Sequence, residues 1–181
     1  MGFTPLAGLM MGTRCGSVDP SVVGFACETL GKTVEEVMSD FNSRSGLKGM
    51  VDDGDSYDMR ALLQRKQDGD PKATLALDMF LYRLAQHIAA SMIALQGPLD
   101  ALVFTAGIGE HSAEIRQRTM ELLKPVLPQV ELDEDRNNND GDGSMGVLSK
   151  EGTWPLVLDI PTDEEAMIGC ECLRLLKKNS Y

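Results

Sequence analysis

A short glycine-rich segment at residues 107–110 could bind the phosphate of a ligand. Gly107-Ile108-Gly109-Glu110 follows an apolar run, residues 101–105, that is typical of a buried strand, and it begins a helix. Small residues let a ligand approach the backbone closely, and a helix N-terminus favours an anion. An ordinary strand-to-helix turn explains the same residues. The full dinucleotide fingerprint is absent, because Ser112 stands where it requires glycine.

A second segment of interest, residues 162–165, follows another apolar run and is rich in carboxylates. Thr162 and Glu165 have the spacing of a capping box, which predicts that a helix begins at Thr162. Asp163 and Glu164 are then left over, and acidic residues often occupy a first turn because of the helix dipole. A carboxylate here could instead bind Mg²⁺, which prefers one or two protein carboxylates together with waters and phosphates.

Two arginines stand where a phosphoryl group could be bound. Arg14 lies in the segment Gly12–Gly16, between two glycines, and its forked guanidinium suits phosphate oxygens. A solvated loop charge is the alternative. Arg60 belongs to Asp58-Met59-Arg60, just before a helical pattern, where a helix cap with a salt bridge is the alternative interpretation.

Other patterns are better explained by structure than by chemistry. Residues 26–33 fit a permissive phosphate-loop pattern, but they overlie a helix, its terminal glycine and the next helix cap. The acidic stretch 133–146 fails as an EF-hand, because the required glycine and glutamate are missing. His87 is interpreted as a core or surface histidine rather than a base, and His111 is of interest because it follows the Gly107 turn.

The elements that must position these residues alternate between helix and strand. Hydrophobic periodicity, caps and breakers predict helices over 19–30, 33–41, 71–95, from the Gly107 turn to 123, and 162–177, strands over 101–105 and 156–160, and loops over 46–57 and 137–143. Strands followed by tight turns and helices indicate parallel βα units. Two strands are few for the helices present, so we expect an incomplete sheet and a chain that begins within a longer protein.

Composition limits the class of protein. A length of 181 residues suits one domain, and a formal net charge of −11 without a basic patch argues against nucleic-acid binding. No apolar run approaches the roughly 20 residues that cross a bilayer, so we expect no membrane span. The cysteines (Cys15, Cys27, Cys170, Cys172) form no CxxC pair, which indicates reduced thiols and a cytoplasmic protein.

Taken in order, these segments resemble the acetate kinase family over residues 1 to about 176. The resemblance is carried by five matches at ordered spacing, which are residues 1–6, residues 10–16 with Asp19-Pro20, Asp58–Arg60, Phe104–Glu110 and Ile160–Glu165. It implies an α/β fold, the ribonuclease H-like C-terminal domain of the acetate and sugar kinase, heat-shock and actin superfamily, with an incomplete sheet and several helices. The whole chain, residues 1–181, would be the nucleotide-binding and dimerisation domain, without the N-terminal domain.

The resemblance also implies a reaction and site residues. The family transfers a phosphoryl group reversibly between ATP and acetate, giving acetyl phosphate and ADP, with Mg²⁺. Arg14 would stabilise the transferring phosphoryl group, and Glu164 would be the magnesium ligand. The residues that would line the adenosine pocket are Asp58, Met59, Arg60, Gly107, Ile108, Gly109, Glu110 and His111.

Two departures and one absence limit what the resemblance implies. The family usually has asparagine where His111 and Asp163 stand. The resemblance implies that the acetate pocket, catalytic histidines, another arginine and a phosphate-binding loop belong to the absent N-terminal half, so we expect this chain alone to be inactive. The family dimerises through the half that is present, which implies a homodimer. Three further hypotheses stay open: a relative specific for propionate or butyrate, a pyrophosphate-dependent relative with its adenosine pocket blocked at Met59 or His111, and a non-catalytic nucleotide-binding or dimerisation module.

Overall fold

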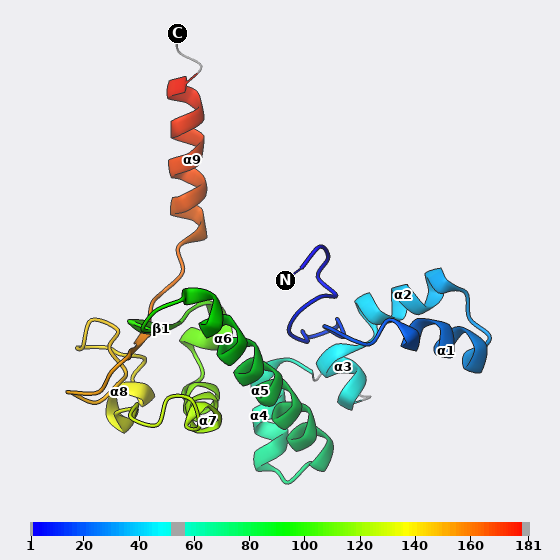
Figure 1. Cartoon of the computed structure of the whole chain (residues 1–181), viewed down its shortest axis with the longest axis horizontal. Coiled ribbons are helices and arrows are strands. Elements are labelled where there is room, and N and C mark those ends of the chain that lie inside the picture. The colour runs from blue at the N-terminus through cyan, green and yellow to red at the C-terminus, as the bar shows by residue number, and fades with distance from the viewer. Residues whose placement is uncertain (1, 52–56, 179–181) are drawn as a thin grey trace. The chain divides into compact units, whose positions relative to one another are not determined.

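The computed structural model describes residues 2–51 and 57–178 (Figure 1). The chain divides into two compact units. The first unit comprises Met1–Pro98 and Arg118–Pro128, and the second comprises Leu99–Gln117 and Gln129–Tyr181. The elements are α1 (Ser21–Leu30), α2 (Val34–Ser43), α3 (Gly46–Val51), α4 (Met59–Gln67), α5 (Pro71–Met92), the short 3₁₀ helix η1 (Ile93–Leu95), β1 (Ala101–Phe104), α6 (Ala106–Glu110), α7 (Ala113–Leu123), α8 (Glu134–Asn138), β2 (Leu156–Asp159) and α9 (Glu164–Lys178).

The long helix α5 forms the core of the first unit, where it packs against α3 and α4. Asp70 caps it by accepting hydrogen bonds from the N–H groups of Lys72 and Ala73, and Pro71 occupies its first turn. The buried side chains of α5 are Ala73, Ala76, Leu77, Phe80, Leu81 and Ala85. The predicted helix is confirmed, with its last three residues, 93–95, in the 3₁₀ helix η1. Its buried residues all lie between 73 and 85 and include alanines, which let the neighbouring helices approach.

Helices α1 and α2 pack against each other as a hairpin, and predicted signals explain where α1 ends and where α2 begins. Helix α1 begins at Ser21, two residues later than predicted, and the residue before it makes no side-chain capping hydrogen bond. Gly31 ends α1 with a left-handed φ of 64°. Thr33 and Glu36 form the predicted capping box at the start of α2, because each side chain accepts from the other residue's backbone N–H. The phosphate-loop pattern at 26–33 therefore has a structural explanation.

Helix α3 corrects the prediction of a loop over residues 46–57. Residues 46–51 are helical, and the segment 52–56 lies outside the described residues. The N–H groups of Leu47 and Lys48 donate to the carbonyls of Met11 and Gly12, at 3.0 and 2.8 Å. Distant backbone thus satisfies the first turn of α3, and no local pattern in the sequence announces such a partner.

Gly46, at the start of α3, lies close against the backbone of residues 11–14, here called the Arg14 loop. Its φ is +61°, and an added Cβ would lie 2.1 Å from the Met11 carbonyl oxygen. We expect Gly46→Ala to lower the free energy of unfolding by about 3 kcal/mol, because left-handed strain and a backbone clash add. Gly31→Ala is the matched control, since Gly31 has a φ of +64° and open space around it, and strain alone should cost about 1 kcal/mol. Urea unfolding measures both variants. Equal losses of unfolding free energy for Gly46→Ala and Gly31→Ala would show that the close approach to Met11 does not restrict residue 46 to glycine.

The second unit contains a two-stranded parallel sheet, as the βα pattern predicts. Ala101 pairs with Leu156 and Phe104 with Asp159, so both carboxyl ends meet at one edge. The N–H of Ile160 donates to the Phe104 carbonyl at 3.0 Å and extends the pairing by one step. The segments predicted to bind phosphate and magnesium both leave the sheet at this edge.

Three boundaries in the second unit differ from prediction. The single helix expected from the Gly107 turn to 123 is two helices, α6 and α7, with a break at His111 and Ser112. The loop predicted over 137–143 begins inside the short helix α8, which Asp133 caps by accepting from the Arg136 N–H. Helix α9 begins at Glu164, two residues later than the capping-box pattern predicted. Across the described residues, no helix combines the length and apolarity needed to cross a membrane.

Candidate functional site

The Gly107 turn begins with two residues in unlike backbone conformations. Thr105 is extended, with φ −159° and ψ 170°, and Ala106 has a left-handed φ of 59°. A left-handed alanine is strained and needs support from its surroundings. The short helix α6 that follows leaves Gly107, Ile108 and His111 exposed, so the backbone of this turn is accessible to a ligand.

Thr162 connects this turn to the segment that carries the predicted magnesium ligand. The Ala106 N–H donates to Thr162 Oγ1 at 3.0 Å, and the Thr162 N–H donates to Glu110 Oε1 at 2.9 Å. The Thr162 hydroxyl also donates to Glu110 Oε1, so the Thr105 hydroxyl, 3.3 Å from Thr162 Oγ1, must be the donor in that pair. The two strand ends are therefore joined through side chains.

The capping box predicted for Thr162 and Glu165 is wrong. The Thr162 hydroxyl is engaged by Glu110 and Ala106, and Asp163 caps α9 by accepting from the Ala166 N–H at 2.9 Å. The sequence could not separate the two caps, because threonine and aspartate both suit the position. Asp163 thus has a structural role, and Glu164 remains exposed in the first turn.

Glu110 is held as a carboxylate by the same contacts. Hydrogen bonds from the side chain and backbone of Thr162 lower the pKa of Glu110. The side chain predicted to line an adenosine pocket is thus bound to Thr162. Its place in an adenosine pocket stays a prediction.

A buried arginine that the sequence analysis missed holds the far side of the turn. Arg116, on α7, is 0% exposed. Its guanidinium donates to the carbonyls of Gly109 and Glu110, at 2.8 and 2.7 Å, and to Asn137 Oδ1 at 2.8 Å. It also forms ion pairs with Asp140 and Asp159. Nothing in the sequence separates this arginine from a solvated helix charge.

Asp159 is the buried counter-charge of Arg116 at the end of β2. Its Oδ2 lies 3.2 Å from Arg116 Nη1, and its Oδ1 has no hydrogen-bond partner among the described residues. Burial raises the pKa of Asp159, and the charge of Arg116 opposes that rise. A buried ion pair of this kind stabilises little by itself, but removing one member leaves the other uncompensated.

We therefore expect Arg116→Met to lower the free energy of unfolding by about 3 kcal/mol, because the Asp159 charge and the turn carbonyls lose their donors. Arg174→Met is the control, since Arg174 is an exposed helix residue with a side chain 68% accessible. Urea unfolding followed by circular dichroism measures both. A loss for Arg116→Met no larger than that of the control would contradict the role of this cluster.

The carboxylates at the start of α9 could contribute to a magnesium site. Glu164 and Glu165 lie in the first turn and are exposed. Over the residues that are described, no group of three or more His, Cys, Asp or Glu side chains could hold a metal. A single carboxylate nevertheless fits Mg²⁺ bound mainly by waters and phosphates. The donor set is therefore compatible with a metal that arrives with a nucleotide.

Within the first unit, the Arg14 loop is fixed by its backbone. The Met11 N–H donates to the Arg14 carbonyl at 3.0 Å, and the Thr13 carbonyl accepts from the Ser45 N–H at 3.0 Å. The Arg14 side chain is exposed, and its Nη1 lies 3.8 Å from the Met11 sulfur. A rigid loop that presents an exposed guanidinium suits a charge held ready for an anion.

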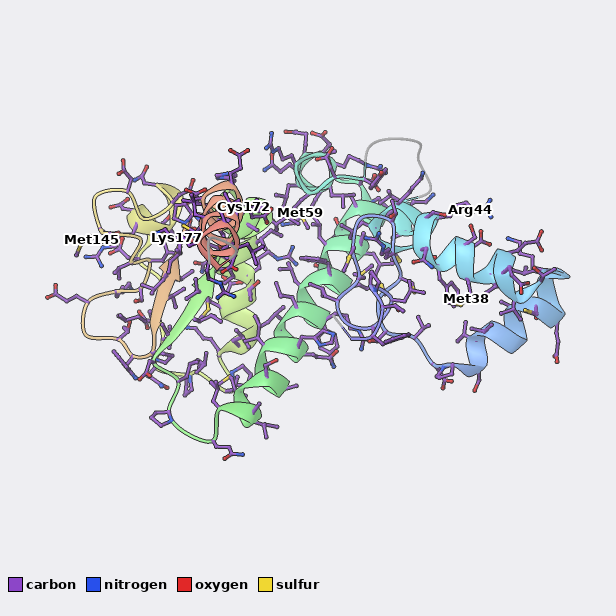
Figure 2. The ribbon with its side chains drawn as sticks, turned by 90° about the horizontal axis from the view of Figure 1, so that it is seen from above. Met38, Arg44, Met59, Met145, Cys172 and Lys177 are labelled. Carbon is purple, nitrogen blue, oxygen red and sulfur yellow. The ribbon has the colours of Figure 1, made fainter. Side chains whose placement is uncertain are left out.

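Asp58, Met59 and Arg60 surround the start of α4. Asp58 caps the helix by accepting from the Ala61 N–H at 3.0 Å, as the structural interpretation of this motif predicted. Met59, labelled in Figure 2, is buried, whereas Arg60 is exposed. Arg60 is thus the member of the motif whose charge remains available.

Tyr57 relates this motif to the Arg14 loop and was not predicted. A Cβ added to Gly12 would lie 3.4 Å from the Tyr57 ring, so the ring packs against the loop. The Lys48 ammonium lies 5.5 Å from the ring centroid. The first unit therefore brings Arg14 and Asp58–Arg60 near one another through a shared aromatic neighbour, which a sequence pattern could not reveal.

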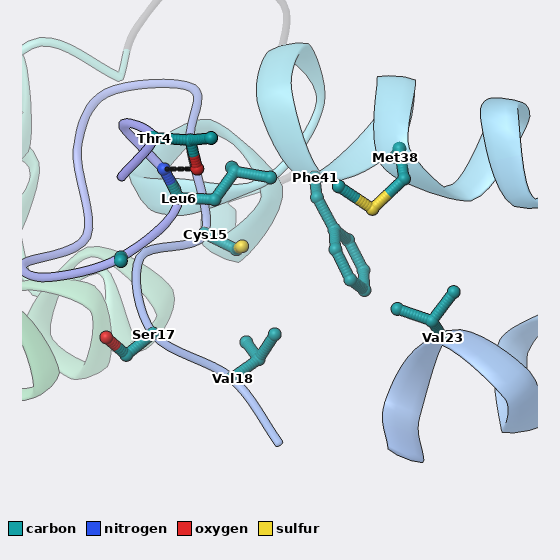
Figure 3. Close-up of a pocket in the computed structure, with 9 residues that line it drawn as sticks. Thr4, Leu6, Cys15, Ser17, Val18, Val23, Met38 and Phe41 are labelled. Atoms are coloured by element: carbon teal, nitrogen blue, oxygen red, sulfur yellow. Dashed lines mark hydrogen bonds between the residues drawn. The ribbon is translucent and has the colours of Figure 1, made fainter. Parts of the chain in front are cut away.

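A cavity in the first unit contains none of the predicted site residues. Figure 3 shows an apolar cavity of about 250 Å³ that is lined by Thr4, Leu6, Ala7, Cys15, Ser17, Val18, Val23, Met38 and Phe41. Burial raises the pKa of Cys15, so its thiol stays protonated.

All four cysteines are free, as predicted, and His87 is exposed on α5.

Comparison with known proteins places the chain among acetate kinases and their relatives. The profile of the acetokinase family matches residues 1–170. The chain is 44% identical to the acetate kinase of Shewanella amazonensis over 98% of its own length and 43% of that protein. It is 46% identical to the acetate kinase of Stutzerimonas stutzeri over 97% of its length and 43% of that protein.

Solved structures agree with the sequence comparison. A propionate kinase from Francisella tularensis superposes with a TM-score of 0.83 at 38% identity, covering 93% of this chain and 41% of that one. The acetate kinase from Entamoeba histolytica gives a TM-score of 0.85 at 31% identity, covering 98% and 44%. The predicted α/β fold is confirmed, and the chain spans less than half the length of these relatives.

Proposed function

The chain belongs to the acetokinase family, and from that premise we propose that it supplies the nucleotide and magnesium half of an acetate kinase. The reaction is reversible phosphoryl transfer from ATP to acetate, giving acetyl phosphate and ADP. The observation that carries the proposal is the edge of the sheet, where the Gly107 turn and the Glu164 segment leave paired strands and are joined by Thr162. Ligands of parallel α/β sheets bind at such carboxyl ends.

Each predicted residue has a place in this proposal. The turn at Gly107–His111 would contact the nucleotide where it is exposed, at Gly107, Ile108 and His111, and Asp58–Arg60 keep their proposed role toward adenosine. Arg14 neutralises the transferring phosphoryl group with its exposed guanidinium. Glu164 would hold Mg²⁺, which would neutralise charge on the nucleotide phosphates. Because phosphoryl transfer asks little covalent work of the protein, positioning and charge dominate.

The acyl half of the reaction belongs to sequence that these residues do not contain. The relatives are more than twice as long as the matched segment, so we propose that the acetate pocket lies in an N-terminal domain and that this chain alone is inactive. We further propose a homodimer and a cytoplasmic location, the latter consistent with the free cysteines.

A different acyl substrate is the second candidate. The propionate kinase from Francisella tularensis shares the fold at 38% identity, which favours propionate over butyrate as that substrate. We rank butyrate, pyrophosphate in place of ATP, and a non-catalytic nucleotide-binding module below acetate and propionate phosphorylation. A pyrophosphate-dependent protein would bind pyrophosphate in preference to ADP.

Calorimetric titration with Mg-ADP tests the nucleotide half. We expect saturable binding by the wild-type chain, weakened roughly tenfold by Glu164→Gln because the metal loses its carboxylate. Glu165→Gln is the matched control, since it removes an equal charge from the neighbouring position in the same exposed turn, and it should leave affinity unchanged. Equal weakening by both substitutions would indicate a general charge effect and contradict the assignment of Glu164.

Acetyl phosphate formation tests the incomplete active site. We expect the chain alone, supplied with Mg-ATP and acetate, to give no product above the rate of a no-enzyme blank, because groups that act together in the transition state are absent. Trapping acetyl phosphate with hydroxylamine measures it. Turnover that Arg14→Ala abolishes would mean that the 181 residues contain a complete active site.

A further inference from the structure

We propose that Thr162 is a positioning residue that couples nucleotide binding at the Gly107 turn to Mg²⁺ binding at Glu164. Glu110 acts through Thr162 in the same way, rather than as a side chain that contacts the nucleotide. The inference rests on the function proposed above and adds how the two parts of the site depend on one another.

The backbone beyond β2 has few other restraints before α9 begins. The Ile160 N–H completes the pairing with β1 at 3.0 Å, but Pro161 has no N–H to continue it. Thr162 is the next residue with a donor, and that donor goes to Glu110 Oε1 at 2.9 Å. The position of the chain that leads to Glu164 is therefore set largely by Thr162.

The same side chain supports the strained start of the turn. Thr162 Oγ1 accepts from the N–H of Ala106, whose φ of 59° places it in the left-handed region. Its hydroxyl hydrogen goes to Glu110 at the other end of α6. One hydroxyl thus contacts both ends of the helix that follows the turn, and Glu164 lies two residues further along the chain.

Nucleotide binding and Mg²⁺ binding are coupled because a ligand that orders the Gly107 turn also acts on the segment that leads to Glu164. A nucleotide that fixes the backbone of Gly107 also fixes Ala106 and Glu110, and through them the segment that holds Glu164. Such coupling is reciprocal, so Mg²⁺ must tighten nucleotide binding by the same factor by which nucleotide tightens Mg²⁺ binding. If Thr162 had only a structural role, its substitution would change the free energy of unfolding without changing this coupling factor.

The test is the ratio of ADP dissociation constants measured by calorimetry in EDTA and in saturating Mg²⁺. We expect wild type to bind at least fivefold tighter with Mg²⁺, within the usual range of coupling factors. Thr162→Val, which replaces the hydroxyl by a methyl group, should bring the ratio within twofold of unity, and Thr162→Ser should restore it. Thr153→Val is the control, because it removes a hydroxyl that donates to the Lys150 carbonyl at 2.8 Å elsewhere in the same unit.

Each outcome bears on the proposal. Should Thr162→Val not unfold cooperatively, Glu110→Ala takes its place with the same expectation, because it removes the shared acceptor and leaves the Ala106 bond. A wild-type ratio retained in both variants overturns the coupling while nucleotide binding stands. A wild-type chain that binds no ADP in either buffer overturns the proposed function, and the coupling falls with it.

Discussion

A guanidinium taken out of water must find an acceptor for its N–H groups, and this constraint organises the second unit. Arg116 is fully buried and finds its acceptors in the Gly107 turn, in α8 and in β2. The contact with Asp159 balances its charge, and the contacts with Gly109 and Glu110 fix the carbonyl side of the turn. Gly107, Ile108 and His111 remain exposed to solvent on the turn.

The other side of the turn is held by a single side chain, that of Thr162. Thr162 supports the left-handed Ala106 and engages the Glu110 carboxylate, so the turn is fixed from the segment between β2 and α9 as well as from α7. A site that must hold phosphate without rearrangement benefits from such support, because ordering a mobile loop costs free energy on binding. In the first unit, α3 plays a comparable part by donating to the carbonyls of the Arg14 loop.

Sequence reasoning predicted the elements with strong local signals and missed those that depend on distant partners. The capping box at Thr33, the long helix α5 and the parallel strands each have a periodic or capping pattern, and each is confirmed. Helix α3 and the role of Arg116 depend on hydrogen bonds to remote backbone, for which the sequence carries no sign. The cap of α9 was assigned to Thr162 because two residue types suited it, and tertiary contacts decided for Asp163.

The central claim is that the Gly107 turn contacts the nucleotide, and backbone amide NMR during a Mg-ADP titration tests it most directly. The account predicts saturable shifts at Gly107, Ile108 and Gly109 that follow one dissociation constant. Amides of α8, which lies on the Arg116 side of the turn, should move far less. Saturable binding with unmoved amides at residues 107–109 would contradict the account, because the ligand would then occupy another part of the chain.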